Sequence, residues 1–135
     1  MKIAAYLNFD GNCAEAFRYY AEALGGKIGF MQTFGESPMA DQVPADKRNQ
    51  VMHVTLNAGD QILLGSDAAG QPYHKPHGFA VCLQLGAAEA ERIWEALSQG
   101  AEVEMPLQQT FWAGRFGMLR DRFGIPWIIN GEEQG

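Results

Sequence analysis

The order of predicted strands and helices repeats once along this chain, and the repeat constrains the fold more than any other feature of the sequence. Each half is predicted to run strand, helix and three further strands. Glu22-Ala23-Leu24 matches Glu95-Ala96-Leu97 just before the two helix ends, and Gln32-Thr33-Phe34 matches Gln109-Thr110-Phe111 at the ends of the second strands. An internal repeat indicates a duplicated structural unit, so the chain is predicted to contain two similar modules.

Turn residues bound the elements of the first half. Ile3–Phe9 is a short apolar run and a predicted strand, and Asn12 is a predicted N-cap that Glu15 completes as a capping box. The helix that follows has apolar residues at helical spacing and ends at Gly25-Gly26. The other predicted segments are the strands Lys27–Phe34, Gln50–Asn57 and Gln61–Gly65 and a long polar loop, Gly35–Asn49.

The second half repeats this order after a linker rich in Gly, Pro and His. Gly124 suits the turn of its closing hairpin, because glycine reaches positive φ without a Cβ clash. A single domain is predicted, with module 1 at about 1–66, a linker at 67–77 and module 2 at about 78–135. The predicted elements of module 2 are Phe79–Leu85 (strand), Ala87–Gln99 (helix), Glu102–Gln109 (strand), and the hairpin strands Arg115–Arg120 and Ile125–Asn130.

Packing of the helices on the sheets determines the predicted fold. The helix residues expected to be buried against strands are Phe17, Tyr20, Leu24, Ile93 and Leu97. One helix covers one face of a sheet, so neither half buries both faces of its sheet alone. We therefore predict an α+β fold, in which tandem βαβββ modules form a curved mixed sheet with a central cavity and the helices outside.

Composition narrows the classes of function. The 135 residues are 47% hydrophobic and 19% charged, as is typical of a soluble globular domain. The formal net charge of -6 disfavours nucleic acid as a partner, since phosphate binding requires a surface rich in Lys and Arg. Cys13 and Cys82 lie in ordinary helix and strand contexts, and no signal peptide or membrane-spanning run is found. We expect a cytoplasmic protein with reduced thiols and no membrane partner.

His53 is the foremost candidate for a functional side chain. Alternate residues of a strand point to opposite faces, and Met52, Val54 and Leu56 are predicted to face the helices. His53 is therefore predicted to face the cavity, near Trp112. It is interpreted as a catalytic base or ligand contact, with a hydrogen-bonded cleft histidine as the alternative.

Four other residues are predicted to contact a ligand. Tyr6 and Asn8 share one strand face, Trp112 lies near a loop, and the charge of Arg115 suits a carboxylate or phosphate. The alternative for Tyr6 and Asn8 is a satisfied core polar group, and for Arg115 it is a solvated surface residue.

Other polar and aromatic residues are assigned to structure. Trp127 lies in an apolar run and is predicted to belong to the core, while Arg120 is interpreted as a solvated surface residue. His74 and His77 flank Lys75-Pro76 and are predicted to lie in an exposed loop. Neither a Ser-His-Asp set, nor a pair of carboxylates, nor a phosphate-binding loop can be assembled at a suitable spacing.

Three stretches resemble a known family. They are Tyr6–Asn12, Ala16–Gly26 and Phe111–Asn130, the last of which reads FWAGRFGMLRDRFGIPWIIN. With the tandem βαβββ plan, they resemble the PhnB-like, glyoxalase-related branch of the vicinal oxygen chelate superfamily, which includes glyoxalase I, fosfomycin resistance proteins and extradiol dioxygenases. Some relatives carry a ubiquinone methyltransferase label. We do not predict that activity, because the sequence lacks a glycine-rich strand-to-helix turn for a nucleotide-like cofactor.

The resemblance implies a divalent metal held by His, Gln or Glu, which polarises two adjacent substrate oxygens. The first-strand ligand position falls at Ala5, or at Tyr6 if the register shifts by one, and the third-strand position falls at His53. The positions on the fifth and last strands fall near Phe79 and Ile128. His53 is the one metal-binding side chain among them, so the metal site is predicted to be incomplete. No cofactor is assigned, and the question of whether a divalent metal binds is left open.

Two functions remain open at this point. The first is a glyoxalase/bleomycin-resistance-like protein that binds a small molecule of unknown identity, and the alternative is a metal-dependent lyase, isomerase or dioxygenase of the same superfamily. Whether the protein is an enzyme is left open. The resemblance also implies a homodimer, and the Gly35–Asn49 loop is long enough to reach a neighbouring subunit.

Overall fold

The chain forms two compact units, Met1–His74 and Lys75–Gly135. The structure is a computed structural model that describes residues 1–111 and 113–132. In the described part of the chain, no helix is both long and apolar enough to span a membrane.

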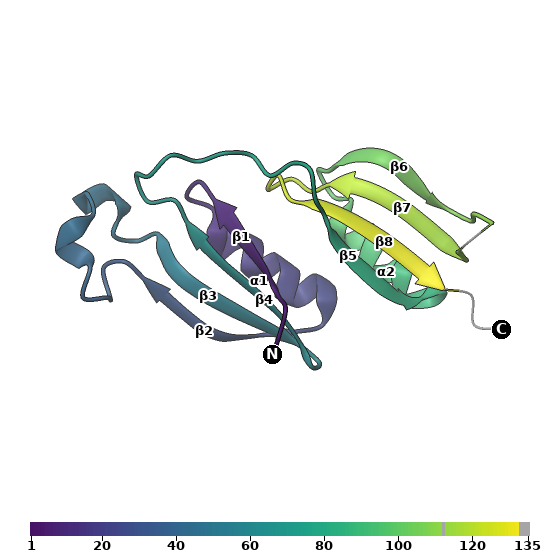
Figure 1. Cartoon of the computed structure of the whole chain (residues 1–135), viewed down its shortest axis with the longest axis horizontal. Coiled ribbons are helices and arrows are strands. Elements are labelled where there is room, and N and C mark those ends of the chain that lie inside the picture. Colours follow the sequence, from purple (N-terminus) through teal and green to yellow (C-terminus); the bar gives the residue numbers. More distant parts are fainter. Residues whose placement is uncertain (112, 133–135) are drawn as a thin grey trace. The chain divides into compact units, whose positions relative to one another are not determined.

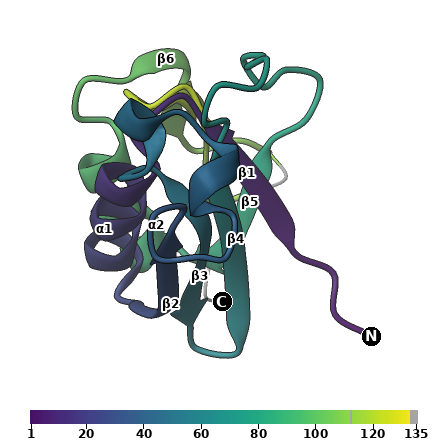
Figure 2. The same cartoon turned by 90° about the vertical axis from the view of Figure 1, so that its left-hand side faces the viewer.

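The first unit is a four-stranded mixed sheet with one helix against it. Along the chain it contains β1 (Ala5–Phe9), α1 (Cys13–Leu24), β2 (Lys27–Thr33), β3 (Val51–Ala58) and β4 (Gln61–Asp67). The strand order is β1-β4-β3-β2, in which β1 and β4 are parallel and the other pairs antiparallel. Figures 1 and 2 show α1 against one face of this sheet.

The second unit has the same plan. It contains β5 (Val81–Gly86), α2 (Ala87–Leu97), β6 (Glu102–Gln108), β7 (Arg115–Arg120) and β8 (Pro126–Glu132). The strand order is β5-β8-β7-β6, again with one parallel pair, β5 and β8 (Figure 1). The predicted α+β fold of tandem βαβββ modules is therefore confirmed, with the strands in two mixed sheets.

The core of each unit lies between its helix and its sheet. In the first unit Phe17 and Tyr20 are fully buried; the ring of Phe17 packs edge-on against Phe9 of β1 and against the ring of Tyr20. In the second unit Ile93 and Leu97 are buried in the same way. Leu24 differs from the prediction, because it is only half-buried at the end of α1. The other predicted helix contacts are confirmed.

Glycines in the last strand of each unit let the helix approach the sheet closely. A Cβ added at Gly65 in β4 would lie 2.5 Å from Cε1 of Phe17, and one added at Gly131 in β8 would lie 2.7 Å from Cβ of Ala90. Any larger residue would push α1 or α2 away from its sheet. Each of the two glycines lies in the strand that pairs in parallel with the first strand of its unit.

The start of α1 is stabilised differently from the prediction. Asn12 occupies the N-cap position but makes no capping hydrogen bond through its side chain, so the capping box with Glu15 is wrong. The carboxylate of Asp67 takes this role instead. It accepts hydrogen bonds from the backbone N–H groups of Gly11 (2.8 Å), Cys13 (3.1 Å) and Val51 (2.8 Å). Asp67 thereby joins the end of β4 to the start of α1 and of β3.

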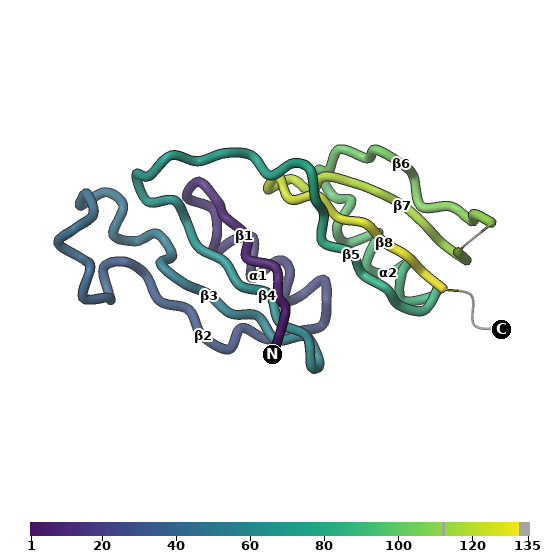
Figure 3. Tube along the Cα trace, viewed as in Figure 1, coloured from purple at the N-terminus to yellow at the C-terminus, as the bar shows by residue number. Residues whose placement is uncertain are grey.

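The segment between β2 and β3 is ordered by its own polar contacts. Figure 3 shows the path of this segment between the two strands. It contains two short 3-10 helices, Ala40–Gln42 and Ala45–Lys47. Its ends pair through hydrogen bonds from Phe34 N–H to Gln50 O and from Gly35 N–H to Arg48 O.

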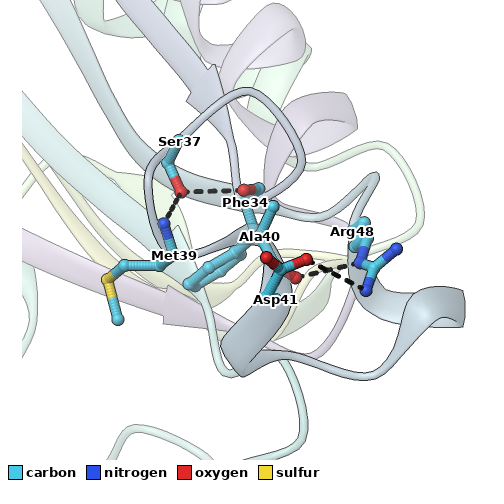
Figure 4. A network of polar contacts seen from close by, with 6 residues as sticks. All are labelled: Phe34, Ser37, Met39, Ala40, Asp41 and Arg48. Carbon is cyan, nitrogen blue, oxygen red and sulfur yellow. Dashed lines mark hydrogen bonds and ion pairs between the residues drawn. The ribbon is translucent and has the colours of Figure 1, made fainter.

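Side chains within this segment form a small network (Figure 4). The hydroxyl of Ser37 donates to the carbonyl of Phe34 at 2.7 Å and accepts from Met39 N–H at 3.1 Å. Arg48 Nε donates to Ala40 O at 2.9 Å, and its Nη2 lies 3.9 Å from Asp41 Oδ1. The segment is therefore a structured arm.

The turn between β7 and β8 is built around a buried carboxylate. Asp121 is 4% exposed and accepts hydrogen bonds from Phe123 N–H, Ile125 N–H and Trp127 Nε1. Gly124 has φ of 92°, as the predicted turn requires. Trp127 is fully buried, which confirms that it belongs to the core.

Candidate functional site

The face of the first sheet opposite α1 carries three of the predicted site residues. In β1, Leu7 and Phe9 are buried towards the helix, with Phe9 in edge contact with the ring of Phe17. Tyr6 and Asn8 alternate with them and lie on the opposite face, where Tyr6 is 46% exposed. The first-strand ligand position was predicted to fall at Ala5 or, if the register shifts by one, at Tyr6. Of these two residues, Tyr6 is the one that lies on this face.

His53 lies on the same face. Val54 and Leu56 in β3 are fully buried, and His53 alternates with them. A register shift between β2 and β3 separates the pairs Gln32–His53 and Thr33–Val51. The shift makes Val51 a fully buried residue, whereas Met52, which was predicted to pack with Val54 and Leu56, is half-buried.

Tyr6, His53 and Phe30 form an aromatic cluster. The hydroxyl of Tyr6 lies 3.4 Å from Nδ1 of His53, and the two rings stack with centroids 5.9 Å apart. The ring of Phe30 lies 6.2 Å from the imidazole, centroid to centroid. Tyr6 and Phe30 are 46% and 48% exposed, so a half-buried imidazole is flanked by two accessible aromatic rings.

Polar residues surround this aromatic cluster. Asn8 Oδ1 accepts a hydrogen bond from Ser66 Oγ at 3.3 Å. Gln32, the strand partner of His53, donates from Nε2 to the carbonyl of Glu36 at 3.3 Å. The Glu36 carboxylate in turn accepts from the N–H and hydroxyl of Thr33, and these hydrogen bonds lower its pKa. The arm after β2 thus begins beside His53.

Sequence reasoning missed Phe30 and Gln32. Phe30 and Gln32 alternate regularly between the two irregularities of β2, but the sequence does not give the register between β2 and β3 that sets them beside His53. Gly29 sits at the first, and a Cβ there would lie 2.5 Å from Nδ2 of Asn57. A glycine within a predicted strand was the available signal for a bulge.

The two remaining predicted ligand contacts are Arg115 and Trp112. Arg115 belongs to the second unit, where its Nε donates to Glu91 Oε1 of α2 at 2.6 Å and its Nη1 donates to Gly114 O at 2.7 Å. Its guanidinium is thus directed to the helix side of the second sheet. Trp112 lies outside the described residues. His74 and His77 are exposed, as predicted for the linker.

The metal positions predicted for the second unit lie just before β5 and within β8. Phe79 lies before β5, which begins at Val81, and Cys82 and Gln84 are the exposed positions of that strand. Ile128 pairs with Cys82 across the parallel strands. Within residues 1–111 and 113–132, no three His, Cys, Asp or Glu side chains gather closely enough to hold a metal ion.

Comparison with known proteins agrees with this fold. A family model described as 3-demethylubiquinone-9 3-methyltransferase matches residues 1–130. Protein YjdN of Escherichia coli K12 is 32% identical, over 96% of this chain and 95% of YjdN. The crystal structure of PA1353 from Pseudomonas aeruginosa is 43% identical with a TM-score of 0.91 and covers 99% of each chain.

More distant structures share the fold. The PhnB protein from Bacillus cereus is 21% identical with a TM-score of 0.81, over 96% of this chain and 98% of that protein. The fosfomycin resistance protein FosX from Listeria monocytogenes is 8% identical with a TM-score of 0.66, over 96% and 90% of the two chains. The predicted PhnB-like resemblance is confirmed: the chain belongs to the family whose model is described as 3-demethylubiquinone-9 3-methyltransferase, and it shares the fold of the PhnB and FosX proteins.

Proposed function

We propose that this protein binds a small planar molecule on the sheet face that carries Tyr6, His53 and Phe30. The observation that carries the proposal is the exposure of two aromatic rings on either side of the His53 imidazole. Accessible aromatic surface next to one hydrogen-bonding group is the usual composition of a ligand site, in which rings stack on the ligand and the polar group orients it.

His53 supplies the polar contact in this proposal. Its Nδ1 shares a hydrogen bond with Tyr6, which leaves Nε2 to bond an oxygen or nitrogen of the ligand. Asn8 and Gln32 add amide groups on the same side of the sheet. The proposed ligand therefore has an aromatic or conjugated body and a polar substituent that reaches His53. In a catalytic version of the site, the same nitrogen would accept a proton from the substrate.

Methyl transfer is not part of the proposal. A methyltransferase needs a bound methyl donor, and nucleotide-like donors commonly use the free amides of a strand-to-helix turn. In the turn between β1 and α1, the N–H groups of Gly11 and Cys13 are already bound by Asp67. The turn is thus closed by the protein's own carboxylate.

The test is a ligand screen by NMR on the full chain, with planar carbonyl and phenolic compounds as probes. We expect hits to shift the imidazole resonances of His53 and the ring resonances of Tyr6. His53→Ala should weaken these hits at least about tenfold, because a hydrogen bond to a buried ligand group is lost. His77→Ala, which removes an exposed linker histidine, is the matched control. Hits that bind His53→Ala and the unmodified protein equally well would refute the proposal.

Metal analysis distinguishes this binding function from the second candidate function, that of a metal-dependent lyase, isomerase or dioxygenase. The placement of His53 at a predicted ligand position supports testing it. Stoichiometric Zn, Ni, Mn or Fe in the purified protein, lost in His53→Ala, would support the enzyme. Tight ligand binding by metal-stripped protein would favour the binding function.

We also propose that the protein is a cytoplasmic homodimer. Cys82 is an exposed free thiol, which a reducing compartment keeps reduced. The ordered arm between β2 and β3 presents Met39 at its surface, 42% exposed, and an exposed apolar side chain on a projecting segment suits a contact with a second copy.

A further inference from the structure

We propose that the second unit carries a small-molecule site of its own, which takes a small monocarboxylate with an apolar body. The site is a cavity of about 300 Å³ on the face of the second sheet opposite α2. In β7 and β8, Leu119, Trp127 and Ile129 are buried towards the helix, and Met118 and Ile128 pair on the other face. The lining includes Phe79, Glu104, Met118, Arg120, Pro126 and Ile128.

Arg120 provides the positive charge of this cavity. Its Nη1 donates to the carbonyls of Pro76 at 2.7 Å and Gly124 at 2.9 Å, so two backbone groups fix the guanidinium in place. Carbonyl oxygens orient the group without neutralising it. Within the described residues, the ion pairs involve Arg48, Arg92 and Arg115, and Arg120 is in none of them. A half-buried, oriented and unneutralised guanidinium favours an anionic partner.

Glu104 determines which anion fits. Glu104 lines the same cavity as Arg120, so the ionisable residues of the lining are one cation and one anion. A phosphate monoester, close to a dianion at neutral pH, would be repelled by Glu104 more strongly than a monoanion. A carboxylate carries a single charge and matches the planar guanidinium. The pair of side chains therefore selects a monocarboxylate.

The rest of the cavity determines the body of the ligand. Met118, Ile128 and Pro126 give an apolar floor, and the ring of Phe79, 61% exposed, lies at the cavity. A volume of about 300 Å³ is at the small end of ligand pockets, which suits a single ring or a short chain. None of these residues belongs to the cluster of Tyr6, His53 and Phe30, so this site is tested independently of the proposed function.

Phenylacetate is a suitable probe, with uncharged phenylacetamide and dianionic phenyl phosphate for comparison. The experiment titrates the full chain with ¹³C-labelled methionine methyl groups and follows Met118, assigned through Met118→Leu. We expect phenylacetate to shift the Met118 signal in a saturable way, and to bind at least about tenfold more tightly than either comparison compound. Equal affinity for phenylacetamide, tighter binding of phenyl phosphate, or no shift of Met118 would overturn the proposal.

Variants then test the two charges. Arg120→Gln should weaken phenylacetate binding about ten- to a hundredfold, whereas Arg122→Gln, in the exposed turn, should leave it unchanged. Glu104→Gln should strengthen binding, because it removes the repulsion without touching the hydrogen bonds of Arg120. This second variant keeps the test decisive if Arg120→Gln unfolds. Weaker binding in Glu104→Gln, or unchanged binding in folded Arg120→Gln, would contradict the assignment.

Discussion

Two buried aspartates organise the chain around them: Asp67 joins three elements, and Asp121 holds the turn between β7 and β8. Asp67 and Asp121 are each 4% exposed, and each carboxylate accepts hydrogen bonds from three N–H donors. A buried charge is tolerated when hydrogen bonds replace its water, and bonds to a charged acceptor are the stronger ones. The charge of Asp67 therefore stabilises the meeting point of β4, α1 and β3.

Asp67→Asn should destabilise the protein by about 1.5–3 kcal/mol. The amide retains one acceptor oxygen but turns the other into a donor that opposes an N–H group, either that of Val51 or those of Gly11 and Cys13. Urea unfolding measures the change, and Asp10→Asn, at an exposed position of the same turn, is the matched control. Equal stability of the two variants would show that the Asp67 carboxylate contributes nothing beyond an exposed one.

Cys13 should be unreactive in the folded protein. Burial raises the pKa of its thiol, and the nearby negative charge of Asp67 raises it further; burial also raises the pKa of Cys82. A raised pKa lowers the thiolate fraction at a given pH, and the thiolate is the reacting form. Iodoacetamide at pH 7.5, followed by intact-mass spectrometry, should modify Cys82 slowly and Cys13 only after denaturation.

The reaction of Cys82 should accelerate as the pH rises past about 9, where an unperturbed thiol is already ionised. Asp67→Asn provides an internal comparison, because it removes the charge beside Cys13 and leaves Cys82 unchanged. Modification of Cys13 as fast as Cys82 in the native protein would contradict the burial of the first thiol.

At the scale of strands and helices, the order of the elements was predictable, whereas local irregularities were not. Alternation placed Tyr6 and Asn8 on one face of their strand and His53 on the face opposite Val54 and Leu56, because β1 and the part of β3 from His53 onward are regular. The register between β2 and β3, which carries two bulges, could not be predicted from the sequence, so Phe30 was not assigned beside His53. Asp67 was assigned to the linker, because its sequence neighbours do not indicate which distant N–H groups its carboxylate binds.

The predicted helix contacts should contribute unequally to the free energy of unfolding, and truncation to alanine measures the difference. Leu97→Ala should cost about 2–5 kcal/mol, because Leu97 is fully buried between α2 and its sheet. Leu24→Ala should cost less, since Leu24 is half-buried at the end of α1. Denaturant titration of both variants gives the comparison. A larger loss for Leu24→Ala than for Leu97→Ala would mean that the end of α1 packs more tightly than the structure shows.

Close approach of α1 to β4 should depend on Gly65. Gly65→Ala adds a Cβ that would meet the ring of Phe17 at 2.5 Å, so we expect a loss of about 1–3 kcal/mol. The double variant with Phe17→Leu should lose less than the sum of the single changes, because the smaller side chain makes room. Ser66→Ala, the next residue on the opposite face, is the control. Additive losses in the double variant would show that the clash is relieved elsewhere.

The whole chain is built twice from one plan. In each unit the first strand pairs in parallel with the last, and a glycine of that last strand faces the helix, Gly65 in one and Gly131 in the other. The open faces have diverged, with an aromatic cluster and a histidine in the first unit and an arginine-lined cavity in the second. The same backbone plan thus carries different side chains on the strand faces opposite the two helices.

The final prediction concerns assembly. The proposed homodimer should have twice the mass of the 14.9 kDa chain when it is measured by light scattering at micromolar concentration. A dimer that is stable at this concentration needs an interface of at least about 1,000 Å². Met39→Asp should raise the dimer dissociation constant at least about tenfold, because a charge would replace an apolar contact of the arm. Ala45→Asp adds the same charge at another exposed position of the arm and should have a smaller effect. A monomer mass for the unmodified protein would refute the dimer, whereas an intact Met39→Asp dimer would place the interface away from the arm.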